Sequence, residues 1–140
     1  MLEIITFEAK IEHEPSNTIT PSAVGQAHNQ FARANNEYAH LGYKVRGTII
    51  THLDSIDPSA ESSLAGIKLI RTDAIIAVWE QLKLLLSEYR ANWDLEHVVT
   101  RQVAADQVLA RLPAAGWFSD ALDKPQVWIT ENEFLGAWPK

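Results

Sequence analysis

The segment Leu2–Lys10, which reads LEIITFEAK, is the starting point for interpreting the whole chain. Its apolar residues precede a polar end, which is typical of a buried strand that leaves the core. Side chains two residues apart in a strand point the same way, so Glu8 and Lys10 are expected on one face. A carboxylate and an ammonium side by side form either a salt bridge or half of a catalytic site. The rest of the sequence is needed to choose between these two interpretations.

The composition is that of an ordinary globular chain. Its 140 residues are 46% hydrophobic, which suits one domain with its own core. No segment is long and apolar enough to cross a bilayer, and no signal peptide is recognisable. The chain has no cysteine, which excludes disulfides and Cys-ligated zinc and favours a cytoplasmic location. The net charge of −6 counts against strong non-specific binding of nucleic acid by this chain alone.

A helix and a second strand are predicted after the opening strand. Thr20 is the expected N-cap, Pro21 the first helical residue and Gly42 the C-terminal stop. An apolar stripe with spacings of three and four residues marks the buried side of this helix: Val24, Ala27, Phe31, Ala34 and Tyr38. The segment Tyr43–Thr51, YKVRGTIIT, has the composition of a strand. Strand, helix and strand form a crossover, which predicts parallel pairing of the two strands.

The second half of the chain is predicted to be mostly helical. A short strand, Ile67–Ile70, precedes a helix from Asp73 to about Ala91 that Thr72 caps. This helix is the most apolar part of the chain, so it is expected in the core or in a subunit interface, with the core favoured. A further helix is predicted over residues 94–112, with these residues facing inward: Leu95, Val98, Val99, Leu109 and Leu112.

The tail is rich in aromatic residues and contains the last predicted strand, VWIT. The aromatic residues of this tail are Trp117, Phe118, Trp128, Phe134 and Trp138. They are expected either to fold back over the core or to form a platform on which bases stack. Few basic residues interleave with these rings, which favours the core.

Glu8 and Lys10 have side chains suited to phosphodiester hydrolysis. That reaction at neutral pH needs a metal ion, an activated water and stabilisation of negative charge. Hard divalent cations prefer carboxylate and carbonyl oxygens, which Glu8 and the backbone of Ala9 supply. Lys10 can orient the water and stabilise developing charge. Gln26 and Gln30, on the flank of the following helix, can hold water or a phosphate oxygen.

The order of these features resembles a known nuclease family. The chain shows an apolar strand ending in Glu8-Ala9-Lys10, a polar loop, a helix containing VGQAHNQ, and the strand VRGTIIT. This order resembles the C-terminal half of the PD-(D/E)xK nuclease core, the restriction-endonuclease-like fold, over residues 2–51. The resemblance implies an α/β fold with a small mixed sheet and a crossover helix, followed here by C-terminal helices and an aromatic tail. It also implies a DNA endonuclease in which Glu8 binds Mg²⁺ or Mn²⁺, Lys10 acts at the attacking water, and Gln26 and Gln30 support the site.

One part of the family's site is missing from the sequence. The family takes an acidic residue, normally Asp, from a strand before Glu-x-Lys, and only Glu3 precedes Glu8 here. Glu3 has an odd separation from Glu8 and is expected on the opposite strand face. We therefore expect one of three situations. The chain is the C-terminal part of a larger nuclease, or another chain, such as a second copy in a homo-oligomer, supplies the acid, or the domain is catalytically silent.

Residues 1–140 are expected to form a single domain, with a nuclease-like core over 1–90 and a helical and aromatic extension over 91–140. The alternative to an enzyme is an inactive nuclease-like domain that serves protein assembly or holds DNA without cutting it. A third alternative is an unrelated α/β protein in which Glu8 and Lys10 pair at a strand end.

The remaining candidates for metal ligands are interpreted as surface residues. Glu12, His13 and Glu14 fall in a polar loop, where solvated side chains are favoured over a metal site. The other histidines, His28, His40, His52 and His97, are isolated in the sequence.

Overall fold

The computed structural model describes residues 2–10, 18–92 and 98–139 of the chain. These residues form two compact units. The first unit combines Met1–Thr72 with Lys124–Ile129, and the second combines Asp73–Asp123 with Thr130–Lys140. The boundary between them falls at residue 72, and the segment Lys124–Ile129 belongs to the first unit. The α/β class predicted from the sequence is confirmed.

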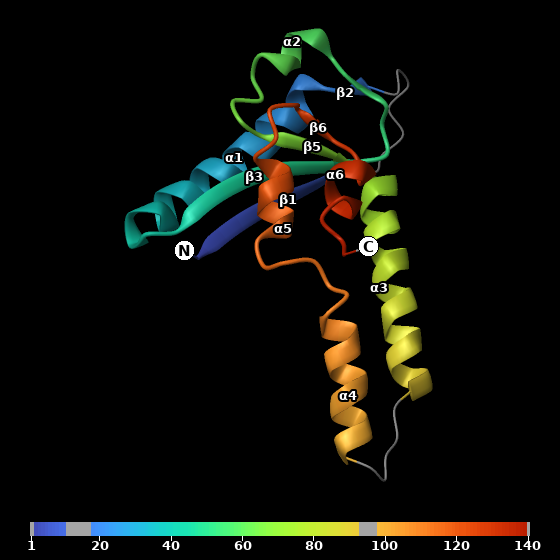
Figure 1. The fold of residues 1–140 in the computed structure, drawn as a ribbon. Coiled ribbons are helices and arrows are strands. Elements are labelled where there is room, and N and C mark those ends of the chain that lie inside the picture. The colour runs from blue at the N-terminus through green and yellow to red at the C-terminus, as the bar shows by residue number, and fades with distance from the viewer. Residues whose placement is uncertain (1, 11–17, 93–97, 140) are drawn as a thin grey trace. The chain divides into compact units, whose positions relative to one another are not determined.

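A parallel sheet forms the centre of the first unit (Figure 1). Its four strands, in spatial order, are β1 (Glu3–Lys10), β3 (Lys44–Thr51), β5 (Lys68–Arg71) and β6 (Trp128–Ile129). Every pairing between these strands is parallel, so the expectation of a mixed sheet is wrong for the described residues. The physical reason is the length of the connections, because each connection is long enough to return the chain to the starting edge of the sheet.

The helix α1 (Pro21–Tyr38) makes the first crossover, and its ends match the sequence prediction. The hydroxyl of Thr20 accepts a hydrogen bond from the backbone N–H of Ala23 at 3.3 Å, and Pro21 is the first helical residue. The helix continues as the 3₁₀ turn η1 (Ala39–Leu41) and stops at Gly42, whose φ of 90° is a left-handed conformation that glycine adopts without strain. Because α1 links β1 to β3, it lies against the same face of both strands.

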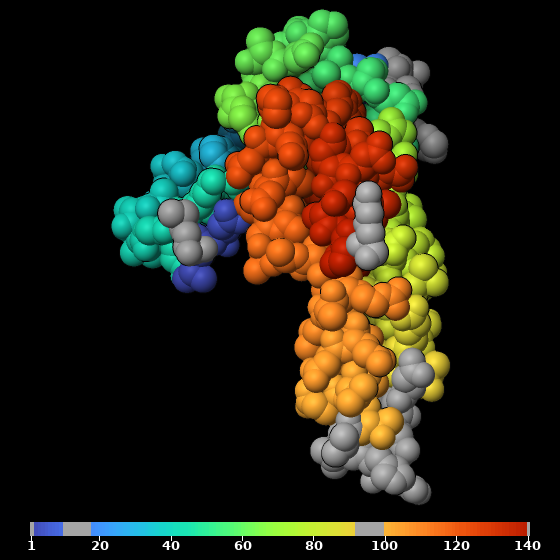
Figure 2. All heavy atoms as spheres, in the orientation of Figure 1, coloured from blue at the N-terminus to red at the C-terminus, as the bar shows by residue number. Residues whose placement is uncertain are grey.

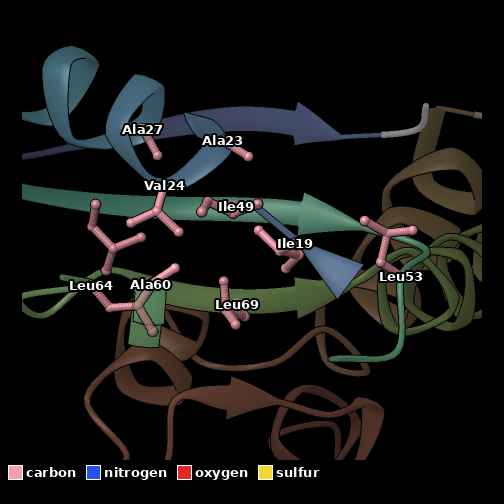
Figure 3. Close-up of a cluster of buried hydrophobic side chains, with 10 residues drawn as sticks. Ile19, Ala23, Val24, Ala27, Ile49, Leu53, Ala60, Leu64 and Leu69 are labelled. Atoms are coloured by element: carbon pink, nitrogen blue, oxygen red, sulfur yellow. The ribbon is translucent and has the colours of Figure 1, made fainter. Parts of the chain in front are cut away.

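The core of the first unit lies between α1 and the sheet (Figure 3). Val24 and Ala27 of α1 are buried against Ile49 of β3 and Leu69 of β5. At Gly47 the strand and the helix come so close that an added Cβ would lie 3.1–3.3 Å from Ile67 and Phe31. The predicted apolar stripe of α1 is therefore the side that packs on the sheet.

The strand β1 is less buried than its sequence predicts. Phe7 is 47% exposed, and β1 is the end strand of the described sheet, with β3 on one side of it. A strand at the edge of a sheet packs against fewer neighbours than a central one, which explains the exposure. The prediction of a buried strand over Leu2–Lys10 is therefore wrong in this respect, although the strand itself is confirmed.

Two small elements of the first unit were not predicted. The strands β2 (Thr18–Ile19) and β4 (Ser55–Ile56) pair in parallel, and the short helix α2 (Pro58–Glu61) follows. Asp57 caps α2 by accepting hydrogen bonds from the hydroxyl and the backbone N–H of Ser59, and these bonds lower the pKa of the Asp57 carboxyl. These elements extend the core, because Ile19 and Ala60 are buried in it.

The second unit is helical. It contains α3 (Thr72–Asn92), α4 (Val98–Leu109), α5 (Trp117–Leu122) and α6 (Glu131–Leu135). Figures 1 and 2 show α3 and α4 side by side, and Arg111 after α4 donates a hydrogen bond to Glu88 of α3. The prediction that Leu109 faces inward is wrong, since its side chain is exposed. The predicted beginning of this helix, residues 94–97, lies outside the described residues.

The aromatic tail forms its own cluster within the second unit. Phe118 and Phe134 stack with ring centroids 4.9 Å apart, and Trp117 meets Phe118, Phe134 and Trp138 edge-on at 5.6–6.0 Å. Phe134 is fully buried. The rings therefore pack against one another, which confirms the core interpretation for these four residues, whereas Trp128 lies in β6 and packs on the core of the first unit.

Candidate active site at the end of β1

Glu8 lies near the carboxyl end of β1, on the side of the sheet that α1 covers. It is in register with Ile49 of β3, whose side chain packs under α1, and residues paired in register share a sheet face. The Nε2 of Gln30 on α1 donates a hydrogen bond of 2.5 Å to Oε2 of Glu8. The structure thus brings together two of the four residues that the sequence assigned to a site, although they are 22 positions apart.

Lys10 is the last residue of β1, and its backbone is in register with Thr51 of β3. The side chain of Lys10 lies outside the described part of the chain. Thr51 is fully buried, and its hydroxyl accepts a hydrogen bond of 3.0 Å from the N–H of Leu53 just after the strand. The end of β1 therefore adjoins the buried end of a central strand.

Gln26 lies one helical turn before Gln30 and on the same side of α1. Its side chain is exposed. Since α1 returns the chain from the carboxyl end of β1 to the start of β3, Gln26 is nearer than Gln30 to the carboxyl edge of the sheet. The two glutamines therefore form a short polar row beside the strand end that carries Glu8.

Glu3 faces away from this site, as its odd separation from Glu8 predicts. It forms an ion pair with Arg46, with 3.7 Å between Oε1 of Glu3 and Nε of Arg46. Arg46 lies one position before Gly47, so it projects from the sheet face opposite to that of Ile49. Glu3 and Glu8 therefore lie on opposite faces of the sheet.

Asp54 and Arg71 also lie at the carboxyl edge of the sheet and were not singled out from the sequence. Nη1 of Arg71 and Oδ1 of Asp54 are 2.5 Å apart. Arg71 is in register with Thr51, so Lys10, Thr51 and Arg71 form one row across three strands. With strands spaced about 4.8 Å apart, the Cα atoms of Lys10 and Arg71 are separated by roughly 10 Å.

A signal for this pair was present in the sequence. Ligand-binding residues of parallel α/β sheets cluster beyond the carboxyl ends of the strands. Asp54 follows the apolar strand at 44–51 and Arg71 ends the one at 68–71. Applied to these two strands, the rule places both residues at the same edge as Lys10.

The described residues do not form a resident metal site. Within residues 2–10, 18–92 and 98–139, no three His, Asp or Glu side chains are grouped so that they could hold a metal ion. Glu8 supplies one carboxylate, and a divalent cation such as Mg²⁺ needs further oxygen ligands. His28 makes a different contact, because its Nε2 meets the backbone carbonyl of Ser63. Glu12, His13, Glu14 and His97 lie outside the described residues.

No helix in the described part of the chain combines the length and hydropathy needed to span a membrane. Comparison with known proteins finds no matching family model, no matching curated protein and no matching solved structure.

Proposed function

We propose that this chain carries the Glu-x-Lys half of a site that hydrolyses phosphodiester bonds in DNA. The observation that supports the proposal most directly is the hydrogen bond from Gln30 to Glu8 on the α1 side of β1. Strand alternation assigns Lys10 to the same face as Glu8. A strand-end lysine beside a carboxylate that accepts a hydrogen bond from an amide agrees with the Glu-x-Lys site that the resemblance to the PD-(D/E)xK nucleases implies.

Each residue has a distinct task in this proposal. Gln30 is a positioning residue, because its amide donates to Glu8 and restricts the orientation of the carboxylate. Glu8 would bind the divalent ion, and Lys10 would orient the attacking water and stabilise negative charge on the phosphate oxygens. Gln26 lies nearer the strand end and can donate to the phosphate. Arg71 adds a second cation to the row at the carboxyl edge.

The proposal requires an acidic residue in addition to Glu8. Since the described residues lack a group that holds a metal ion, we expect Mg²⁺ or Mn²⁺ to bind only with donors from outside those residues. A preceding domain, a second chain or the phosphate of bound DNA can supply such oxygens. The divalent ion, the DNA substrate and a cytoplasmic location stay predictions.

The experiment that tests the proposal is DNA cleavage by the full chain with Mg²⁺ or Mn²⁺. We expect Glu8→Ala and Lys10→Ala to abolish cleavage, and Gln30→Ala to lower its rate about 10–100-fold, as loss of a residue that orients a metal or site ligand does. Glu3→Ala is the matched control, because Glu3 lies on the same strand and faces Arg46. Cleavage that is unchanged in Lys10→Ala contradicts the proposal.

A second candidate function is that of an inactive nuclease-like domain for protein assembly. It is favoured by the lack of a metal-holding group among residues 2–10, 18–92 and 98–139 and by exposed apolar side chains on α3. The net charge of −6 makes assembly a better match than holding DNA. Calorimetric titration with Mn²⁺ in the presence of duplex DNA, whose phosphates supply the further oxygen ligands, distinguishes the two functions. Binding that Glu8→Ala removes and Glu3→Ala retains supports the nuclease, and no binding supports the assembly domain.

A further inference from the structure

One side of α3 exposes a row of large side chains that we call the α3 stripe: Ile76, Trp79, Lys83 and Leu86. Ile76 and Trp79 are each 52% exposed and Leu86 is 50% exposed. Their spacings of three, four and three residues place them on one side of the helix. The buried residues Ala74 and Leu85 lie on another side. The prediction that α3 is a core helix is therefore correct for one side and wrong for the stripe.

The charges along α3 determine which way a second helix can lie on the stripe. Asp73 is in the first turn and Arg90 is in the last turn. A second copy of α3 in the parallel orientation would bring Asp73, Lys83 and Arg90 against their own counterparts. In the antiparallel orientation, the acidic start of each helix faces the basic end of the other, and the two helix dipoles are opposed.

A single antiparallel alignment matches the whole stripe to itself. When two copies are centred on Gln81, Ile76 lies opposite Leu86 of the second copy and Trp79 lies opposite Lys83 of the second copy. The first pair is apolar. In the second, the alkyl chain and ammonium of Lys83 can cover the face of the indole ring. Lys83 is bonded to Glu80 of its own helix at 3.0 Å, which keeps it on this side.

We propose that the α3 stripe is a homodimer interface in which α3 packs antiparallel on α3 of a second copy. The two-fold symmetry of such a pair requires a self-complementary surface, which the alignment provides. The stripe has four side chains per copy, so the contact buries less than the roughly 1,200 Å² of a stable interface. The dimer is therefore weak and forms in proportion to protein concentration. This inference is independent of the proposed nuclease activity.

Sedimentation of the full chain over a range of concentrations tests the dimer. We expect the wild-type chain to shift from monomer to dimer as concentration rises, and Leu86→Asp to weaken the dimer at least about tenfold, which corresponds to about 1.4 kcal/mol. Leu84→Asp is the matched control. Leu84 is 59% exposed on the same helix but lies about 160° away from Leu86, so its substitution leaves the dimer unchanged.

Cross-linking tests the orientation, and the absence of cysteine makes it selective. Ile76→Cys and Leu86→Cys are prepared as chains of different mass, mixed, and treated with a short bismaleimide. In the antiparallel dimer the two introduced thiols meet only in the mixed pair, because identical positions are about 15 Å apart along the axis. Products formed by either variant alone overturn the proposed orientation. A wild-type chain that stays monomeric at every concentration overturns the interface and leaves the stripe to a different protein.

Discussion

The helices α1 and α3 are both long and amphipathic, but they bury their apolar residues to different extents. The buried positions of α1 are small or medium in size, such as Val24 and Ala27, and they lie flat against β3 and β5. In α3, the large residues Ile76, Trp79 and Leu86 are about half exposed. The number of apolar residues in a helix therefore does not indicate how much of the helix is buried. The extent of burial depends on the surface against which the helix packs.

The structural reason lies in what each helix connects. The helix α1 is the crossover between two paired strands, so the sheet covers its apolar stripe along most of its length. Within the second unit, α4 lies beside α3, and the side of α3 that carries Ile76, Trp79 and Leu86 is left about half exposed. The second unit thus leaves an apolar surface that a partner can occupy, whereas in the first unit the sheet covers the apolar residues of α1.

The largest expected difference in stability is between two isoleucine-to-alanine substitutions, one beneath α1 and one on the α3 stripe. Ile49→Ala removes a fully buried side chain beneath α1 and is expected to lower the free energy of unfolding by about 2–5 kcal/mol. Ile76→Ala, on the α3 stripe, is expected to change it by about 0.5 kcal/mol or less. Urea unfolding followed by circular dichroism at low protein concentration measures both. Similar losses at the two positions would contradict the contrast between the helices.

A smaller effect is expected at Gly47 of β3, which lies against Phe31 of α1. In Gly47→Ala the new methyl group lies 3.1–3.3 Å from side-chain atoms of Ile67 and Phe31, so these side chains must move by a few tenths of an ångström, and we expect a cost of about 1–3 kcal/mol. Gly25→Ala is the control within α1. Nothing lies within 4 Å of its added methyl group, so the substitution is expected to stabilise the helix by about 0.5–1 kcal/mol. The opposite signs can be read from the thermal midpoints, and a neutral Gly47→Ala would refute the close contact.

The smallest expected effect is a pH dependence of the stability of α2, the short helix of the first unit that Asp57 caps. The hydroxyl and N–H of Ser59 hold the pKa of Asp57 below its ordinary value. Because the folded-state pKa is the lower one, the cap of α2 is stabilising above about pH 4 and is lost as the pH falls through the lowered pKa. Amide exchange at Ser59 and Ala60 should accelerate on acidification, and exchange along α3 should not. Asp57→Asn should remove this pH dependence while keeping most of the cap.

Much of the first unit could be predicted because its signals are local. Thr20, Pro21 and Gly42 mark the ends of the first helix by capping chemistry that involves neighbouring residues. By contrast, β2, β4 and α2 are too short for a periodic pattern, and they form because Ile19, Ile56 and Ala60 pack on the core. The edge position of β1 was also not predictable, since its apolar residues match a central strand equally well.

In the candidate site, too, some features follow from local sequence patterns and others from tertiary contacts. Strand alternation alone separates Glu8 from Glu3, and the structure places Glu3 with Arg46 on the other face. Gln30 was expected near the site because helix geometry places it on a flank of the stripe. Its bond to Glu8, and the pairing of Arg71 with Asp54, depend on how strands far apart in the chain align.

By itself, the sequence determined the class of fold, the main helices and strands, and the face on which Glu8 lies, because periodicity and capping act over a few residues. Only the tertiary structure decided that the sheet is parallel throughout its described strands, that β1 is at its edge, and that α3 exposes an apolar stripe. These features depend on which surfaces meet, and contacts between distant segments leave no pattern within any one of them.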